Sequence, residues 1–281
     1  MALKLFRRGT PASDAAEMSF IDHLEVLRGH LLRSLLAIVV GAVIVGIFNK
    51  FFIQEVLMGP THQRFPTYGL MCRLGRFLQL GQTLCLEGIG IKMQSTTVSG
   101  QFSMWITIVL IGGVIIAFPY IFYEFWRFVK PALTDKELGR TRGVVFWVSL
   151  LFFIGVFFGY FIIAPYTINF FASFQIDETV ENRWTITSYI DTMIPLVLGA
   201  GLAFQLPLVM IFLAKVGIVS SRYLASVRKY AVVVIFIVAG VITPGPDVIS
   251  QLSVALPLIL LYEISIILTR RVAAREAQEW S

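Results

Sequence analysis

Long apolar runs separated by short polar segments make up most of the chain after residue 30. A helix of roughly 20 residues crosses a hydrocarbon core of about 30 Å. The pattern predicts one membrane domain at residues 19–272, preceded by a disordered tail at 1–18 and followed by a second tail at 273–281. Within this domain we expect six transmembrane helices, at about residues 31–53, 102–126, 144–171, 193–214, 230–243 and 247–268.

The last two predicted helices are short, and the sequence Thr243-Pro244-Gly245-Pro246-Asp247 separates them. As a helix, the run from Tyr230 to Ile242 covers only roughly 20 Å. The two runs form either two short spans that thin the bilayer locally or a re-entrant pair. Both arrangements leave the C-terminus on the same side. Asp247 is well placed to cap the first turn of the last helix.

The composition supports an all-α integral membrane protein. Hydrophobic residues make up 57% of the chain and charged residues 14%, with a mean hydropathy of +0.80, whereas a soluble domain carries about a quarter charged residues. The formal net charge is +6. Basic residues in such a chain mostly record its topology, so we expect the lipid bilayer as its surroundings and no nucleic-acid partner.

The distribution of basic residues predicts the orientation. Of the 23 lysines and arginines, 17 lie in the N-terminal segment up to Arg33, in the second and fourth connections between spans, and after the last span. Positive charge concentrates in cytoplasmic loops. Six helices with both termini in the cytoplasm are consistent with this distribution.

The segment from Phe118 to Glu137 carries the most specific pattern in the chain. Pro119 removes a backbone donor, so the second helix is expected to bend there. Aromatic residues follow, and then a short basic loop, as is typical where a membrane helix meets the lipid headgroups. The sequences Tyr123-Glu124-Phe125-Trp126 and Phe128-Val129-Lys130-Pro131-Ala132-Leu133, with Glu137 beyond them, resemble the first cytoplasmic loop of the TatC family.

The resemblance implies the multi-spanning receptor subunit of the twin-arginine protein translocase, in the bacterial cytoplasmic membrane. Its implied partners are twin-arginine signal peptides of folded substrates, single-span TatA- and TatB-type subunits, and further copies of itself in the complex. The implied energy source is the proton-motive force. The sequence shows no nucleotide-binding loop, which fits this expectation, and no cofactor is expected.

Glu137 is the leading candidate for binding an arginine pair. A carboxylate in a basic loop offers a bidentate partner for a guanidinium, and the resemblance assigns this contact to Glu137, with Phe128, Pro131 and Leu133 around it. The alternative is an ordinary exposed loop residue neutralised by neighbouring basic side chains.

A second motif precedes the first span, at His23-Leu24-Glu25-Val26-Leu27-Arg28. Apolar residues at helical spacing predict an amphipathic helix at the membrane interface. The segment resembles the TatC motif His-Leu-x-Glu-Leu-Arg, but Val26 occupies the glutamate position and Glu25 lies one residue earlier, about 100° around a helix. Glu25 and Arg28 are therefore candidates for signal-peptide binding, or a surface pair that neutralises itself.

Phe204-Gln205-Leu206-Pro207 places an amide inside the fourth span, where a polar side chain usually faces protein or water. The resemblance implies contact with the single-span subunits through Phe204, Gln205 and Pro207. An amide that satisfies backbone groups freed by Pro207 is a compatible alternative. Glu124 and Glu263 lie near helix ends and are expected to be structural charges at the interface.

Two cysteines, Cys72 and Cys85, fall in the long connection that the topology places outside the cell. An oxidising compartment favours a disulfide between them, and two free thiols are the alternative.

Two other classes of protein were weighed. An intramembrane enzyme needs a nucleophile with a base, or metal ligands, within the spans; the histidines, His23, His30 and His62, lie outside the span cores, so catalysis is not expected. A six-helix transporter of small molecules or ions predicts ionisable residues at mid-membrane. Here the charges lie toward helix ends, which fits peptide binding at a surface better.

Overall fold

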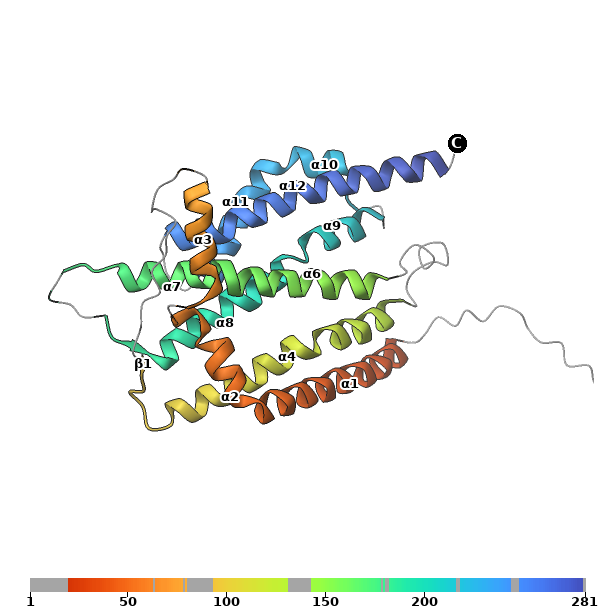
Figure 1. Cartoon of the computed structure of the whole chain (residues 1–281). Coiled ribbons are helices and arrows are strands. Elements are labelled where there is room, and N and C mark those ends of the chain that lie inside the picture. The colour runs from red at the N-terminus through yellow and green to blue at the C-terminus, as the bar shows by residue number, and fades with distance from the viewer. Residues whose placement is uncertain are drawn as a thin grey trace, which may run out of the picture.

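The computed structural model describes residues 20–62, 64–77, 79, 93–130, 143–177, 179, 182–215, 218–243 and 248–279. In these ranges the chain is mostly helical (Figure 1). The elements are α1 (Phe20–Ile47), α2 (Asn49–Phe51), η1 (Phe52–Leu57), η2 (Gly59–Thr61), α3 (Pro66–Phe77), β1 (Met93–Gln94), α4 (Gly100–Val129), α6 (Val144–Phe158), η4 (Gly159–Ile163), α7 (Ala164–Ser173), β2 (Trp184–Thr185), α8 (Ile186–Ala203), α9 (Leu206–Lys215), α10 (Ser221–Ser226), α11 (Arg228–Ile242) and α12 (Val248–Glu279).

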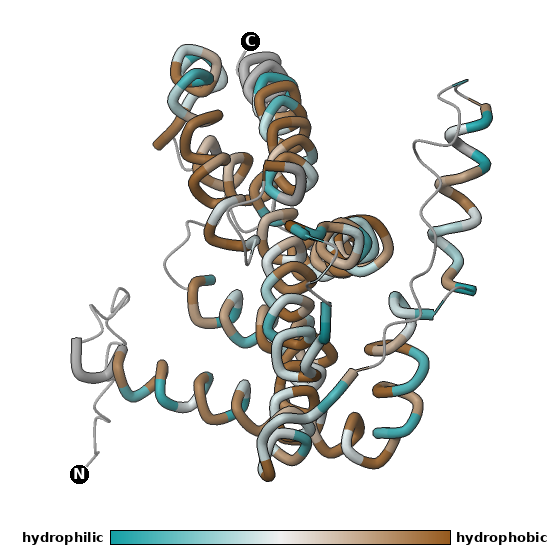
Figure 2. Tube along the Cα trace, turned by 90° about the vertical axis from the view of Figure 1, so that its left-hand side faces the viewer, coloured by the Kyte–Doolittle hydropathy of each residue, from teal (hydrophilic) through white to brown (hydrophobic). Residues whose placement is uncertain are grey.

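Apolar side chains cover the outward surface of the bundle, and Figure 2 shows apolar residues along most of the length of its helices. On α1, Leu31, Leu35, Val39 and Val43 recur every fourth residue and are 67%, 56%, 53% and 54% exposed. Residues at this spacing share one helix face. A continuous apolar face of this kind is stable only against lipid or another apolar surface.

Five stretches of the described chain are long and apolar enough to cross a membrane: Leu24–Ile47, Gly100–Val129, Val144–Ser173, Ile186–Ala214 and Gln251–Arg271. The helix α11 has 15 residues and is not one of them. The expectation that both final helices are short holds for α11 alone, because α12 has 32 residues and runs to Glu279. The last apolar run continues into a polar helical segment, so the helix does not end where the run does.

Two of the long stretches are interrupted near prolines. The π-helix η4 lies between α6 and α7, directly before Pro165 in the first turn of α7. The helices α8 and α9 are separated by a turn at Phe204 and Gln205, just before Pro207. Proline removes a backbone donor and clashes with the preceding turn, which explains why both breaks precede one. In contrast, α4 remains a single helix through Pro119.

The helices α1 and α4 lie side by side (Figure 1) and touch through their backbones. A Cβ atom on Gly41 would lie 2.6 Å from the carbonyl oxygen of Gly113, and one on Gly113 would lie 2.6 Å from the amide nitrogen of Ala42. Small residues allow this approach, which gives van der Waals contact where lipid provides no hydrophobic driving force. The crossing fixes which residues of the two helices face each other.

The second half of the chain packs around α8 and α12. One buried cluster joins α8 to α11 and α12 through residues such as Leu196, Ala239 and Leu258. The side-chain amide of Gln251 on α12 donates to the carbonyl oxygen of Phe236 on α11 at 2.9 Å. The short helix α11 is therefore held against the long helix α12.

Three tyrosine hydroxyls hold the segment that follows α1. Tyr160 in η4 donates to the carbonyl oxygen of Val56 at 2.5 Å, and Tyr189 in α8 donates to that of Leu57 at 2.6 Å. Tyr68 in α3 donates to the carbonyl oxygen of Pro60. Burial raises the pKa of Tyr68 to about 12, so its hydroxyl remains a donor into the alkaline range. These bonds satisfy backbone carbonyls that the irregular helices η1 and η2 leave without a helical partner.

Tyr189→Phe is expected to lower the free energy of unfolding by about 1 kcal/mol, because it leaves the Leu57 carbonyl without its donor. Thermal unfolding of the purified protein measures the change, and hydrogen exchange should rise in residues 52–61. Tyr230→Phe is the control, since Tyr230 is 62% exposed. Equal effects of the two substitutions would contradict the assigned role of the Tyr189 hydroxyl.

Cys72 in α3 is disulfide-bonded. The other cysteine of the chain, Cys85, lies outside the described residues, as do the predicted cap Asp247 and the tail at 1–18. The strands β1 and β2 form a parallel pair, with Met93 beside Trp184 and Gln94 beside Thr185.

Candidate functional site

The start of α1 and the end of α4 lie together at one end of the bundle (Figure 1), called the basic end here because Arg28, Arg33, Arg127 and Lys130 lie there. The segment with Glu25 and Arg28 belongs to α1 itself, which runs without a break from Phe20 to Ile47. The predicted interfacial segment is therefore continuous with the first span.

Three of the predicted signal-peptide residues are described at the basic end. Glu25 and Arg28 on α1 are both exposed, and Phe128 on α4 is half-buried. In the described part of the chain, Glu25 and Arg28 form no ion pair with each other, so the neutralised surface pair is not observed. Pro131, Leu133 and Glu137 lie outside the described residues, in the connection from α4 to α6. That connection leaves α4 directly after Lys130.

Glu124 forms a buried polar cluster near the basic end, which the sequence did not predict. Its side chain is 2% exposed, and its Oε2 lies 2.5 Å from Nδ1 of His30 and 3.6 Å from Nη1 of Arg33, both on α1. The only sequence signal was a carboxylate within an apolar run, which needs a partner in the membrane.

The predicted partner-binding residues lie at the break between α8 and α9. Gln205 donates through Nε2 to the carbonyl oxygen of Val148 on α6 at 3.2 Å and to that of Gly201 at 3.5 Å. Its Oε1 is buried and has no hydrogen-bond partner in the described structure. Phe204 packs against Phe158, with ring centroids 5.3 Å apart, and Pro207 is buried. The amide therefore satisfies backbone carbonyls with its donor and keeps its acceptor unused.

Glu263, the other structural carboxylate expected from the sequence, pairs across α11 and α12. Its Oε2 lies 2.8 Å from Nη2 of Arg228, with side chains 40% and 53% exposed. An exposed pair of this kind contributes little to stability. The carboxylate of Glu263 is therefore exposed, whereas that of Glu124 is buried.

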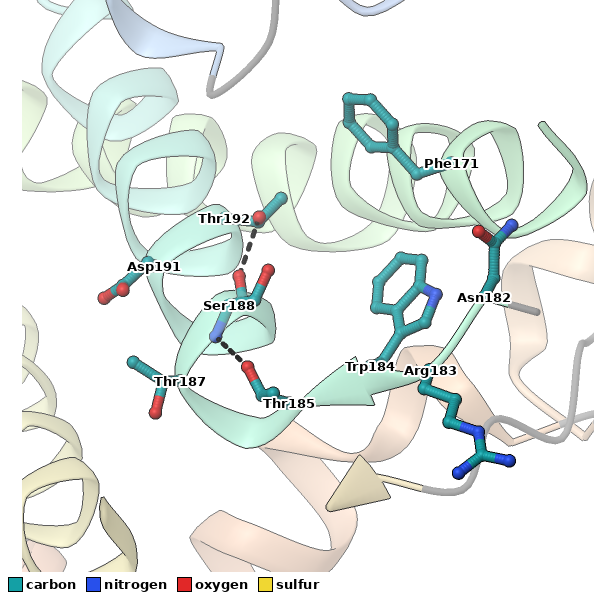
Figure 3. Close-up of a pocket in the computed structure, with 9 residues that line it drawn as sticks. All are labelled: Phe171, Asn182, Arg183, Trp184, Thr185, Thr187, Ser188, Asp191 and Thr192. Atoms are coloured by element: carbon teal, nitrogen blue, oxygen red, sulfur yellow. Dashed lines mark hydrogen bonds between the residues drawn. The ribbon is translucent and has the colours of Figure 1, made fainter. Parts of the chain in front are cut away.

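Two hollows lie elsewhere in the described structure. A polar one of about 750 Å³ borders the first turns of α8. The rings of Trp184 and Phe171 line one side of it, and Ser188 and Asp191 of α8 lie on the other side (Figure 3). An apolar one of about 370 Å³ lies between η1, α4, α6 and α8. No group of three or more potential metal ligands occurs among the residues that the structure describes.

This geometry defines a polytopic helical membrane protein with kinked helices and a polar surface at one bundle end. The family model "Sec-independent protein translocase protein (TatC)" matches residues 22–257. The chain therefore belongs to the TatC family.

Individual relatives support the same assignment over nearly the full length. A Blattabacterium TatC protein is 36% identical over 261 residues, which cover 92% of this chain and 98% of the relative. The TatC protein of Aquifex aeolicus is 32% identical and is covered to 98%. A crystal structure described as the twin-arginine translocase receptor TatC superposes with a TM-score of 0.69 at 31% identity, over 89% of this chain and 99% of that one.

Family membership makes this chain a multi-pass membrane component of a Sec-independent protein translocase. The resemblance inferred from the loop motif is confirmed. The alternative of a small-molecule or ion transporter is not supported by these comparisons.

Proposed function

We propose that the chain is the subunit of a twin-arginine translocase that binds signal peptides at its basic end, and that this end faces the cytoplasm. The supporting observation is that exposed Glu25 and Arg28 lie on α1 within two turns of His30, whose ring packs against half-buried Phe128 near the end of α4, where the connection containing Glu137 begins. The sequence places Glu137 seven residues after Lys130. A carboxylate there would accept two parallel hydrogen bonds from a guanidinium.

In this proposal the chain crosses the membrane six times, with both termini in the cytoplasm. Besides the five long stretches, α11 would be the sixth span, although its 15 residues cover only roughly 22 Å. A short span is accommodated by local thinning of the bilayer. The basic residues at the start of α1, the end of α4 and the end of α12 then all lie on the cytoplasmic side. This agrees with the enrichment of lysine and arginine in the cytoplasmic segments of membrane proteins.

The break between α8 and α9 is the proposed contact for single-span TatA- and TatB-type subunits. The Oε1 of Gln205 is buried there without a hydrogen-bond partner in the described structure, and a polar group on a neighbouring helix would donate to it once the side chain turns outward. The proposal includes assembly with further copies of the chain and transport driven by the proton-motive force.

The test is export of a folded reporter by cells in which this chain and its own single-span partners replace the host translocase. A reporter with paired arginines in its signal is expected to cross the membrane, and a version with paired lysines is expected to remain inside, because lysine lacks the bidentate fork. Site-specific crosslinking from residue 25 should reach the signal of the first reporter only. Equal export of both reporters, or of neither, would contradict the proposal.

A further inference from the structure

Glu124 has to be paired because of where it lies. Its side chain is 2% exposed, and it belongs to a helix that is otherwise apolar through the preceding turns. An isolated carboxylate is costly in such surroundings. The exposed fractions of its two basic neighbours differ, at 12% for His30 and 52% for Arg33. His30 is therefore the inner partner, and Arg33 contacts the carboxylate from the surface.

His30 also touches the predicted signal-peptide surface. Its ring packs edge-on against Phe128, with centroids 6.1 Å apart and an interplanar angle of 65°. Glu124 and Phe128 are one turn apart on α4 and so share a face. The imidazole of His30 thus contacts both residues at once: its Nδ1 lies against the carboxylate of Glu124, and its ring packs in a T-shaped arrangement against Phe128.

The two helices have a second contact that joins them without this cluster. Gly41 and Gly113 bring the backbones together about three turns from His30 and Glu124 on their respective helices. A contact that joins α1 to α4 is therefore already present, and the hydrogen bond between His30 and Glu124 is not needed to hold the two helices together. The distinctive consequence of the cluster is the fixed orientation of the His30 ring.

We propose that His30 is a positioning residue for signal-peptide binding: Glu124 holds its imidazole against Phe128 and so fixes the position of the Phe128 ring in the site. The proposal rests on the proposed function, since it assigns a role within the same signal-peptide surface. His30 and Glu124 act through Phe128, and neither has to touch the peptide.

The experiment uses the full-length protein in detergent or nanodiscs and a fluorescent signal peptide with paired arginines. Four proteins are compared: wild type, His30→Gln, Glu124→Gln and the double variant. The glutamine in place of His30 can still donate to Glu124 but has no ring. Each single variant is expected to weaken peptide binding roughly threefold to tenfold, the range of one aromatic contact. The double variant should bind no more weakly than the weaker single variant, because both changes act through one contact.

Thermal unfolding separates positioning from stability. His30→Gln should keep a melting temperature close to that of wild type while losing affinity. Glu263→Gln is the matched control, because it removes an ion pair between helices away from Phe128; its peptide affinity should not change. Additive losses in the double variant, unchanged affinity in the single variants, or affinity that falls only with melting temperature would each overturn the proposal.

The same titrations distinguish this inference from the proposed function. A wild-type protein that binds paired-arginine and paired-lysine peptides equally would contradict the receptor function itself. A wild-type protein that prefers paired arginines, together with variants of unchanged affinity, would contradict only the role of His30.

Discussion

Glu137→Gln is expected to reduce binding of a paired-arginine signal peptide by more than tenfold and to abolish export of the folded reporter. Glutamine keeps the shape of the side chain and removes its charge, so the charge-assisted bidentate contact is lost. Hydrogen bonds to charged groups contribute about 1.5–3 kcal/mol each, and about 1.4 kcal/mol corresponds to tenfold in affinity. Peptide titration and reporter export, at matched protein levels, measure the two effects.

Specificity gives a sharper result than affinity alone. The Glu137→Gln variant should bind paired-arginine and paired-lysine peptides almost equally, because the group that distinguishes the planar fork is gone. Glu55→Gln is the control, since Glu55 is an exposed carboxylate in η1, away from the basic end. A Glu137→Gln variant that still prefers paired arginines would show that the pair is read elsewhere, and Glu25→Gln would then be tested in the same way.

The predicted spans depended on hydropathy, which reports where a helix can lie in lipid but not where it ends. Because polar residues at the membrane interface can continue a helix, α1 begins at Phe20 and α12 continues to Glu279. The breaks near Pro165 and Pro207 lie where proline disturbs the local backbone. Pro119, where a bend is expected, lies within the single helix α4, so a proline does not by itself determine whether a helix breaks.

The candidate site was predictable only in part. The motif around Phe128 indicated the family, and the helical spacing of the Glu25 segment predicted a helix. The role of Glu124 could not be inferred, because its partner His30 lies 94 residues away in the sequence. Only the packing of α1 on α4 brings the two together, and that packing depends on a glycine contact that hydropathy does not detect.

Gly113→Val is expected to produce the largest loss of stability, about 3 kcal/mol, in the upper range for overpacking. A Cβ at residue 113 would lie 2.6 Å from the nitrogen of Ala42 and 2.9 Å from the carbonyl oxygen of Ile38. Both are backbone atoms of α1, so the clash cannot be relieved by a rotamer change. The helices have to separate, which also moves His30 from Glu124. Thermal unfolding and the amount of protein in the membrane measure the effect.

Two other glycines of α1 and α4 provide controls with different expected results. Gly29→Ala lies in α1 where no atom is within 4 Å of the new Cβ, so it should be neutral or stabilise by up to about 1 kcal/mol through helix propensity. Gly112→Ala would meet the side chain of Val45 at 3.0 Å, which can shift by a few tenths of an ångström, so its effect should be intermediate. A Gly113→Val variant with wild-type stability would mean that α1 and α4 are not in backbone contact, and the positioning of His30 would lose its structural basis.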